Sequence, residues 1–203
     1  MTEGYIKFQC NWEQKEINIQ KELFQVLEEA RSKLFKLGLI GMYPDGIGFG
    51  NISVKSGENK SFIITGSATG QFAHLNRSHF ALVTGYNFAE NSVSCAGMTR
   101  ASAESLTHAA VYEALPDVGA VVHIHCLWLW EKLRNNSPTT SEEIEYGTPE
   151  MAYAVKNMAA TLNPEQEKVI VMGGHREGIL AFGRNLKEAS SSIINLYNQY
   201  KND

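Results

Sequence analysis

A buried strand that ends in two histidines constrains this chain more than any other feature. Residues 118–122 (Val-Gly-Ala-Val-Val) are mostly β-branched and apolar, as in a strand covered on both faces, and His123-Ile124-His125 continues the run. Because side chains two residues apart in a strand share a face, His123 and His125 project side by side. Two such imidazoles suit zinc or a similar divalent metal, whereas a buried pair without metal needs separate hydrogen-bond partners. The alternative is a chance His-x-His on a solvated edge strand.

The composition is that of an ordinary globular protein. The chain has 203 residues, of which 43% are hydrophobic and 20% charged, so we expect one domain over residues 1–203, with residues 1–16 as an N-terminal strand extension. The net charge is -4 and the basic residues are scattered, which argues against nucleic-acid and anionic-membrane partners. No apolar stretch approaches the length of a membrane span.

The cysteines indicate the cellular compartment. There are three, Cys10, Cys95 and Cys126, and an odd number without framework spacing argues against a secreted disulfide scaffold. The first residues lack the basic and apolar regions of a signal peptide. We therefore expect reduced thiols and a cytoplasmic protein.

Hydrophobic periodicity predicts the order of the elements. Strands are expected at residues 5–12, 52–55, 62–65, 79–86, 91–96, 118–125, 169–172 and 178–182, with a hairpin loop at 56–59. Helices are expected at residues 17–37, 102–115, 127–133, from 148 onward, and 186–200. The order predicts an α/β fold with a mainly antiparallel central sheet flanked by helix layers.

A glutamate and a histidine in the helix before the His-x-His strand are candidates for chemistry. Glu104 is placed in the first helical turn, with Ser102 as the N-cap. Near a divalent metal, Glu104 would serve as a ligand or a general base; otherwise it is a glutamate stabilised by the helix dipole. His108 lies one turn later on the same helix face, where it either orients Glu104 and supports the metal site or is simply a half-buried histidine.

Two further groups of residues extend this list. His175 and Glu177 follow Gly173-Gly174, and either would complete a metal site, although His-Arg-Glu-Gly is also typical turn material. The small-residue loops 48–51 and 66–70 and the helix start offer backbone N–H groups and hydroxyls to a phosphate or another anion, although glycine loops mostly just turn the chain. The residues assigned to substrate or phosphate binding are Asn51, Gly66, Ser67, Thr69, Gly70 and Ser102.

Taken together, these residues resemble the class II aldolase/adducin family over roughly residues 20–200. The matching elements are Gly50-Asn51-Ile52-Ser53, Ile64-Thr65-Gly66, Ser102-Ala103-Glu104 with His108, residues 117–125, Gly147-Thr148, and residues 178–183. The resemblance implies a mainly antiparallel sheet between helix layers and homotetramers with active sites at subunit interfaces. It also implies zinc or another divalent metal held by three histidines, two of them His123 and His125, and a glutamate, Glu104, that exchanges protons with an enediolate.

The chain departs from the family pattern in three places. The third histidine of the family precedes a glycine; here Glu177 precedes Gly178, so we favour His175 as third ligand, with Glu177 as the alternative or an added ligand. Phosphate-binding members carry Ser-Ser-Glu, whereas this chain has alanine at residue 103. The segment 126–146, which supplies a tyrosine proton donor in some aldolases, is short here; Tyr146 and Tyr197 are candidate substitutes.

The leading hypothesis is a divalent-metal lyase of aldolase type acting on a small hydroxy-carbonyl compound or a sugar phosphate. Within the enzyme class, an epimerase or dehydratase remains open. The alternative outside it is a non-catalytic, adducin-like oligomeric interaction domain. The paired histidines and Glu104 favour the enzyme, because a scaffold has no physical need for them.

Overall fold

The structure is a computed structural model and describes residues 6–57 and 60–201. The strands in this part of the chain are β1 (Gln9–Gln14), β2 (Gly41–Met42), β3 (Gly48–Phe49), β4 (Asn51–Lys55), β5 (Phe62–Thr65), β6 (Phe80–Asn87), β7 (Ser92–Gly97), β8 (Ala120–His125), β9 (Val169–Val171) and β10 (Gly178–Gly183). The helices are α1 (Lys21–Lys36), α2 (Ser105–Ala114), α3 (Leu127–Leu133), α4 (Pro149–Ala159) and α5 (Leu186–Lys201), with a 3₁₀ turn at Arg77–His79.

One large sheet organises the described residues, and the histidine strand lies inside it. Its strand order is β1-β7-β6-β5-β4-β8-β10-β9, and all neighbouring pairs are antiparallel except β1 with β7. Strand β8 pairs with β4 through Asn51 opposite His123, and with β10 through Gly178 opposite His125. All six residues of β8 are buried, so the two histidines do not lie on a solvated edge. The predicted α/β fold with a mainly antiparallel sheet is confirmed.

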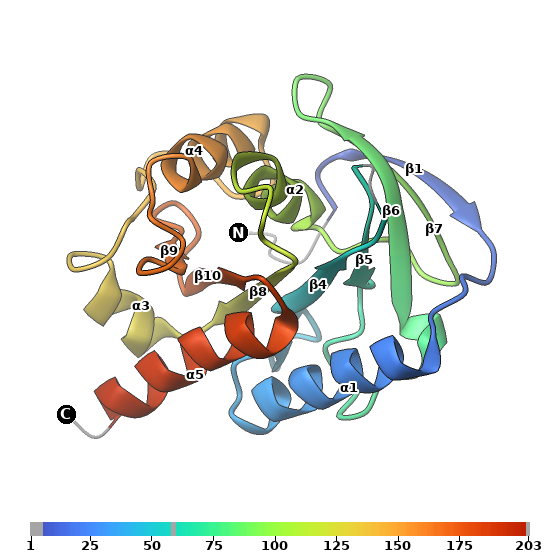
Figure 1. The fold of residues 1–203 in the computed structure, drawn as a ribbon, viewed down its shortest axis with the longest axis horizontal. Coiled ribbons are helices and arrows are strands. Elements are labelled where there is room, and N and C mark those ends of the chain that lie inside the picture. Colours follow the sequence, from blue (N-terminus) through green and yellow to red (C-terminus); the bar gives the residue numbers. More distant parts are fainter. Residues whose placement is uncertain (1–5, 58–59, 202–203) are drawn as a thin grey trace.

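Helices cover both faces of the sheet (Figure 1). Helices α2 and α4 pack with Val121, Leu180 and other residues of one face, whereas α1, α3 and α5 pack with Val122, Ile179 and others of the opposite face. Because side chains alternate along a strand, His123 and His125 share the face of Val121. They therefore point toward the layer that contains α2, which carries the residues next to Glu104.

Several predicted boundaries move in the structure. Helix α2 begins at Ser105 with Glu104 as its N-cap, so the prediction of Ser102 as N-cap is wrong; Ser102 instead accepts hydrogen bonds at its Oγ from the Glu104 N–H and at its carbonyl from Ser105. The first strand begins at Gln9, and Tyr5 of the predicted strand lies outside the described residues. The hairpin loop predicted at 56–59 falls partly outside them as well. Thr148 caps α4 by accepting from the Met151 N–H, as predicted.

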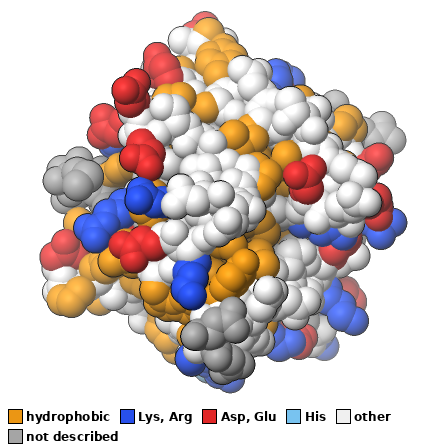
Figure 2. Space-filling model, turned by 90° about the vertical axis from the view of Figure 1, so that its left-hand side faces the viewer, with side chains coloured by type: hydrophobic (Ala, Val, Ile, Leu, Met, Phe, Trp, Pro, Cys, Tyr) orange, Lys and Arg blue, Asp and Glu red, His pale blue; other side chains and the backbone are white. Residues whose placement is uncertain are grey.

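One face of the molecule shows how its charged side chains are distributed. On the face drawn in Figure 2, acidic and basic side chains are interspersed with hydrophobic ones. Such mixing does not provide the single-sign field that would attract nucleic acid to this face. Among the described residues, no helix combines the length and the apolar character needed to cross a membrane.

Candidate metal centre

Three histidines from distant parts of the sequence meet on the α2 side of the sheet. His123 and His125 come from β8, and His175 comes from the turn between β9 and β10. One ring nitrogen from each lies within 4.8 Å of the others, and all three side chains are buried. The Nε2 atoms of His123 and His125 are 2.9 Å apart. The structure thus brings together the three histidines that the sequence analysis favoured.

The hydrogen bonds of His123 indicate which nitrogen faces the cluster. Its Nδ1 lies 3.3 Å from the carbonyl of Ile179, which can only accept, so we assign the ring proton to Nδ1 and the lone pair to Nε2. Burial lowers the pKa of His123 well below its usual value, and the neighbouring imidazoles lower it further. Burial and His175 do the same to the pKa of His125. Neutral imidazoles with lone pairs directed inward are the form that binds a metal ion.

Glu104 lies beside this cluster and is held by its own helix. Its carboxylate is buried, and Thr107 donates a hydrogen bond of 2.6 Å to Oε2. The other oxygen, Oε1, lies 3.9 Å from Nδ1 of His175. One carboxylate oxygen is therefore fixed by Thr107, while the other faces the histidines, which is the arrangement needed by a group that exchanges a proton there.

A pocket open to solvent on one side leads to these residues. The space not filled by atoms measures about 460 Å³ when the open solvent at its mouth is included. The residues that line it are Gly48, Phe49, Gly50, Asn51, Gly66, Ser67, Ala68, Thr69, Gly70, Ser102, Ala103, Glu104, His123, His125, Tyr146 and His175. All six residues assigned to substrate or phosphate binding are among them. Within the described residues, the buried Oδ1 of Asn51 has no hydrogen-bond partner, so it is available to a ligand hydroxyl or N–H.

The small-residue loop 66–70 forms one wall of the pocket because it packs tightly against the β2–β3 hairpin. A Cβ atom at Gly70 would lie 2.0 Å from the carbonyl oxygen of Gly41 and 2.8 Å from Cα of Gly48. Only glycine allows this approach. The glycine here therefore positions the loop in addition to turning the chain.

Arg31 of α1 anchors the end of this loop and the residues that follow it, over residues 69–73. Its side chain is 1% exposed, and its guanidinium donates to four backbone carbonyls, those of Thr69, Gly70, Phe72 and Ala73. Burial lowers the pKa of Arg31 to about 10, which still leaves it charged at neutral pH. An arginine was not expected here from the sequence, where it reads as one polar residue of an amphipathic helix.

We expect Arg31→Met to destabilise the protein by about 3 kcal/mol, because it leaves several buried carbonyls without their donor. Urea unfolding monitored by circular dichroism measures the change. The matched control is Lys33→Met on the same helix, whose exposed ion pair with Glu29 should contribute less than about 1 kcal/mol. Equal stability of Arg31→Met and the wild type would contradict the anchoring role.

The structure also shows the surroundings of Glu177 and His108, the two remaining candidates from the sequence. The side chain of Glu177 accepts a hydrogen bond from Tyr43 and is outside the three-histidine group. His108 is fully buried and bonded through Nδ1 to the hydroxyl of Ser53, and burial lowers its pKa to about 3. Among the contacts described for Glu104, the side-chain donor is Thr107, which the sequence analysis did not single out. The sign of this contact in the sequence is that Thr107 lies three residues after Glu104, a spacing that brings side chains together on one helix face.

Of the two tyrosines considered as proton donors, the structure places Tyr146 in the pocket. Its ring stacks on His175 with a centroid distance of 4.4 Å and an interplanar angle of 20°. Tyr197 lies on α5 in the opposite layer, where it contacts Trp128. Position alone therefore favours Tyr146.

The residues present fit a divalent metal ion. Three buried imidazole nitrogens around one point form a donor set suited to zinc, copper, iron or nickel. Three protein ligands beside an open pocket are typical of catalytic rather than structural sites. In addition, two Nε2 atoms 2.9 Å apart repel each other when both carry lone pairs, and a shared cation removes this repulsion.

Comparison with solved structures shows which proteins share this fold. An L-fuculose-1-phosphate aldolase from Thermus thermophilus matches at 21% identity with a TM-score of 0.60, covering 90% of this chain and 97% of that one. A sugar-phosphate aldolase from Thermotoga maritima matches at 16% identity with a TM-score of 0.63, covering 87% and 90%. YgbL from Klebsiella pneumoniae, a candidate aldolase/epimerase/decarboxylase, matches at 18% identity with a TM-score of 0.65, covering 87% and 85%. At these identities the likeness shows the fold alone.

Comparison by sequence gives the family. No curated protein matches the chain significantly. The model of the class II aldolase and adducin N-terminal domain matches residues 44–200, which include the loops, the glutamate and all three histidines of the pocket. By this match over most of its length, together with the fold, the chain belongs to the class II aldolase/adducin family.

Proposed function

We propose that this protein is a metal-dependent lyase of aldolase type that acts on a small hydroxy-carbonyl compound, such as a sugar phosphate. The single observation that carries the proposal is the position of a buried carboxylate, Glu104, beside three converging histidines at the end of an open pocket. Zinc is our first choice of metal, and another divalent ion is the second. We propose His123, His125 and His175 as its ligands. When bound, the cation would supply a positive charge that polarises a carbonyl oxygen of the substrate.

The protein's own residues would supply binding and proton transfer. Oε1 of Glu104 would take a proton from the carbon or hydroxyl next to the substrate carbonyl, while Thr107 holds Oε2 and so fixes the direction of transfer. The loop 66–70, Ser102 and Asn51 would bind the polar groups of the substrate, including a phosphate. Tyr146, which lines the pocket, would give a proton to a leaving group. We further propose a homotetramer in the cytoplasm, with active sites at subunit interfaces, in line with the family.

The test combines metal analysis with a substrate panel. Purified protein is analysed for metals by mass spectrometry and then incubated in deuterated water with ketose phosphates and free ketoses, with mass detection of products. One divalent ion per chain and carbon–carbon cleavage would support the aldolase. Deuterium incorporation without cleavage would instead support an epimerase or dehydratase. Folded, metal-free protein without turnover would favour the non-catalytic interaction domain; protein stripped with a chelator serves as the control.

A further inference from the structure

A chain of two hydrogen bonds leads away from the metal centre through His125. Nδ1 of His125 lies 2.9 Å from the hydroxyl oxygen of Tyr43, and this hydroxyl lies 2.7 Å from Oε2 of Glu177. A carboxylate can only accept, so the single hydroxyl proton of Tyr43 is donated to Glu177. The hydroxyl oxygen must then accept from His125, which places the ring proton on Nδ1 and leaves the lone pair on Nε2, the nitrogen that faces His123.

Both partners of His125 are held by tight local structure. Tyr43 lies in the turn between β2 and β3, where its N–H donates to the Ile47 carbonyl at 2.8 Å and its ring packs on Phe49 at a centroid distance of 4.4 Å. The carbonyl of Glu177 accepts from the Cys126 N–H at 3.0 Å. The backbones that carry both side chains are therefore fixed by hydrogen bonds of their own.

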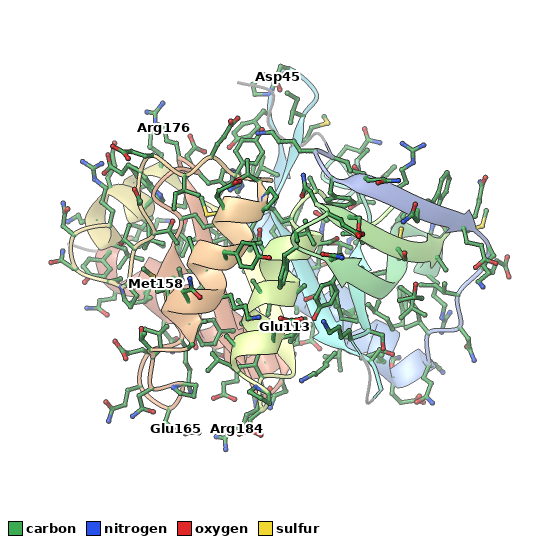
Figure 3. All side chains as sticks on the ribbon, turned by 90° about the horizontal axis from the view of Figure 1, so that it is seen from above. Asp45, Glu113, Met158, Glu165, Arg176 and Arg184 are labelled. Atoms are coloured by element: carbon green, nitrogen blue, oxygen red, sulfur yellow. The ribbon has the colours of Figure 1, made fainter. Side chains whose placement is uncertain are left out.

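The hairpin and the turn that carry Tyr43 and Glu177 lie at one edge of the molecule. Figure 3 shows Asp45, at the hairpin tip, and Arg176, in the turn before β10, along the same edge, with Glu165 and Arg184 at the opposite one. The turn also carries His175, two residues before Glu177. One short segment thus supplies both a member of the histidine cluster and the carboxylate that ends the hydrogen-bond chain.

The backbone at Glu177 is strained. Its φ is +76°, which lies in the left-handed region that residues other than glycine, asparagine and aspartate rarely adopt. Glycine would satisfy this turn at lower cost. Strain of this kind persists where the rest of the structure compensates for it, often at functional sites. Compared with glycine, glutamate adds only its side chain at this position. The hydrogen bond between that side chain and Tyr43 is therefore the gain that offsets the strained backbone.

We propose that Tyr43 and Glu177 are positioning residues that fix the ring orientation and the tautomer of His125 and thereby raise the affinity of the three-histidine centre for a divalent cation. The proposal rests on the metal centre described under the proposed function. Outer carboxylates and hydroxyls that hold the second nitrogen of a metal-binding histidine commonly change metal affinity by about 10–100-fold. Under this proposal Glu177 acts on the metal centre through Tyr43 and His125 and is not itself a ligand.

Zinc affinity of single and double variants provides the first test. Tyr43→Phe, which keeps the ring against Phe49, and Glu177→Ala, which removes the acceptor, are each expected to weaken zinc binding by about 10-fold or more in competition with a chromophoric chelator. The zinc affinity of the double variant is expected to be only slightly lower than that of the weaker-binding single variant, because both changes break the same chain of hydrogen bonds. Tyr153→Phe on the exposed side of α4 and Glu142→Ala are the matched controls, with wild-type affinity.

Glu177→Gly separates metal positioning from stability. Because glycine relieves the positive φ, its melting temperature is expected to equal or exceed that of the wild type, while zinc affinity falls about as far as in Glu177→Ala. A purely structural glutamate would give the opposite pattern, a lower melting temperature with unchanged zinc affinity. Wild-type affinity in Glu177→Gly or in Tyr43→Phe would overturn the proposal.

Nitrogen-15 NMR of the metal-free protein tests the tautomer without reference to metal or activity. The ring of His125 is expected to carry its proton on Nδ1 in the wild type and to populate both tautomers in Tyr43→Phe. The same tautomer in both proteins would overturn the proposal even if the wild type binds zinc. Conversely, wild-type protein that shows the Nδ1–H tautomer but binds no divalent ion would overturn the metal centre, and with it the affinity effect, while leaving the hydrogen-bond chain itself established.

Discussion

His123→Ala is expected to weaken the binding of a divalent cation by roughly a hundredfold or more and to lower any turnover with it. Zinc sites in small folded domains bind with about 10–16 kcal/mol from a full ligand set. Loss of one ligand from a set of three should therefore weaken binding by roughly a hundredfold or more. The variant removes the nitrogen that lies 2.9 Å from His125 Nε2 and leaves no donor in its place. Metal content after dialysis and zinc titration of the apoprotein measure the effect.

The control for His123→Ala is the same substitution at an exposed histidine. His74 lies near Glu28 on the surface, with a side chain 74% exposed, so His74→Ala should bind metal like the wild type. Circular dichroism and urea unfolding show whether His123→Ala still folds. A folded His123→Ala protein that retains a full equivalent of tightly bound metal would rule out the three-histidine centre.

Glu104→Gln should lower turnover by about 100-fold or more while leaving the metal in place. The amide has the same shape and can still accept the hydrogen bond from Thr107, but it cannot take up a proton, and loss of a general base commonly costs about 10²–10⁴-fold. The rate of cleavage, or of deuterium exchange from solvent into the substrate, measures the effect on whichever substrate the panel identifies. Metal content is read in parallel.

Glu113→Gln on the same helix is the matched control. Glu113 pairs with Lys60 and Lys156 and does not line the pocket, so its turnover should match the wild type. Turnover of Glu104→Gln equal to that of the wild type would remove Glu104 from the mechanism. Parallel loss of metal would instead show that Glu104 is a ligand.

Strong local patterns predicted the elements best. Helix α3 has the predicted bounds, and Thr148 caps α4 as expected. The start of α2 was misplaced by three residues, because Ser102 has the side chain of an N-cap but instead belongs to a turn before Glu104. Helix ends depend on which turn satisfies the free backbone groups, and sequence offers several equivalent choices.

Contacts between distant segments could not be predicted. Arg31 anchors a loop about 40 residues further along the chain, and Tyr43 reaches Glu177 across 134 residues. In the sequence, both read as ordinary polar or aromatic residues. Their roles arise only when the sheet order brings the β2–β3 hairpin, the loop 66–70 and the turn before β10 to one edge.

The sequence by itself determined that two imidazoles share one face of a buried strand, since the period of two along a strand requires it. It also determined the class of fold, through the order of apolar runs and caps. Tertiary structure alone decided that His175 rather than Glu177 joins the pair, which oxygen of Glu104 faces them, and that Tyr43 bonds to both His125 and Glu177. These depend on strand order and on the packing of loops against one another, and neither has a period that can be read along the chain.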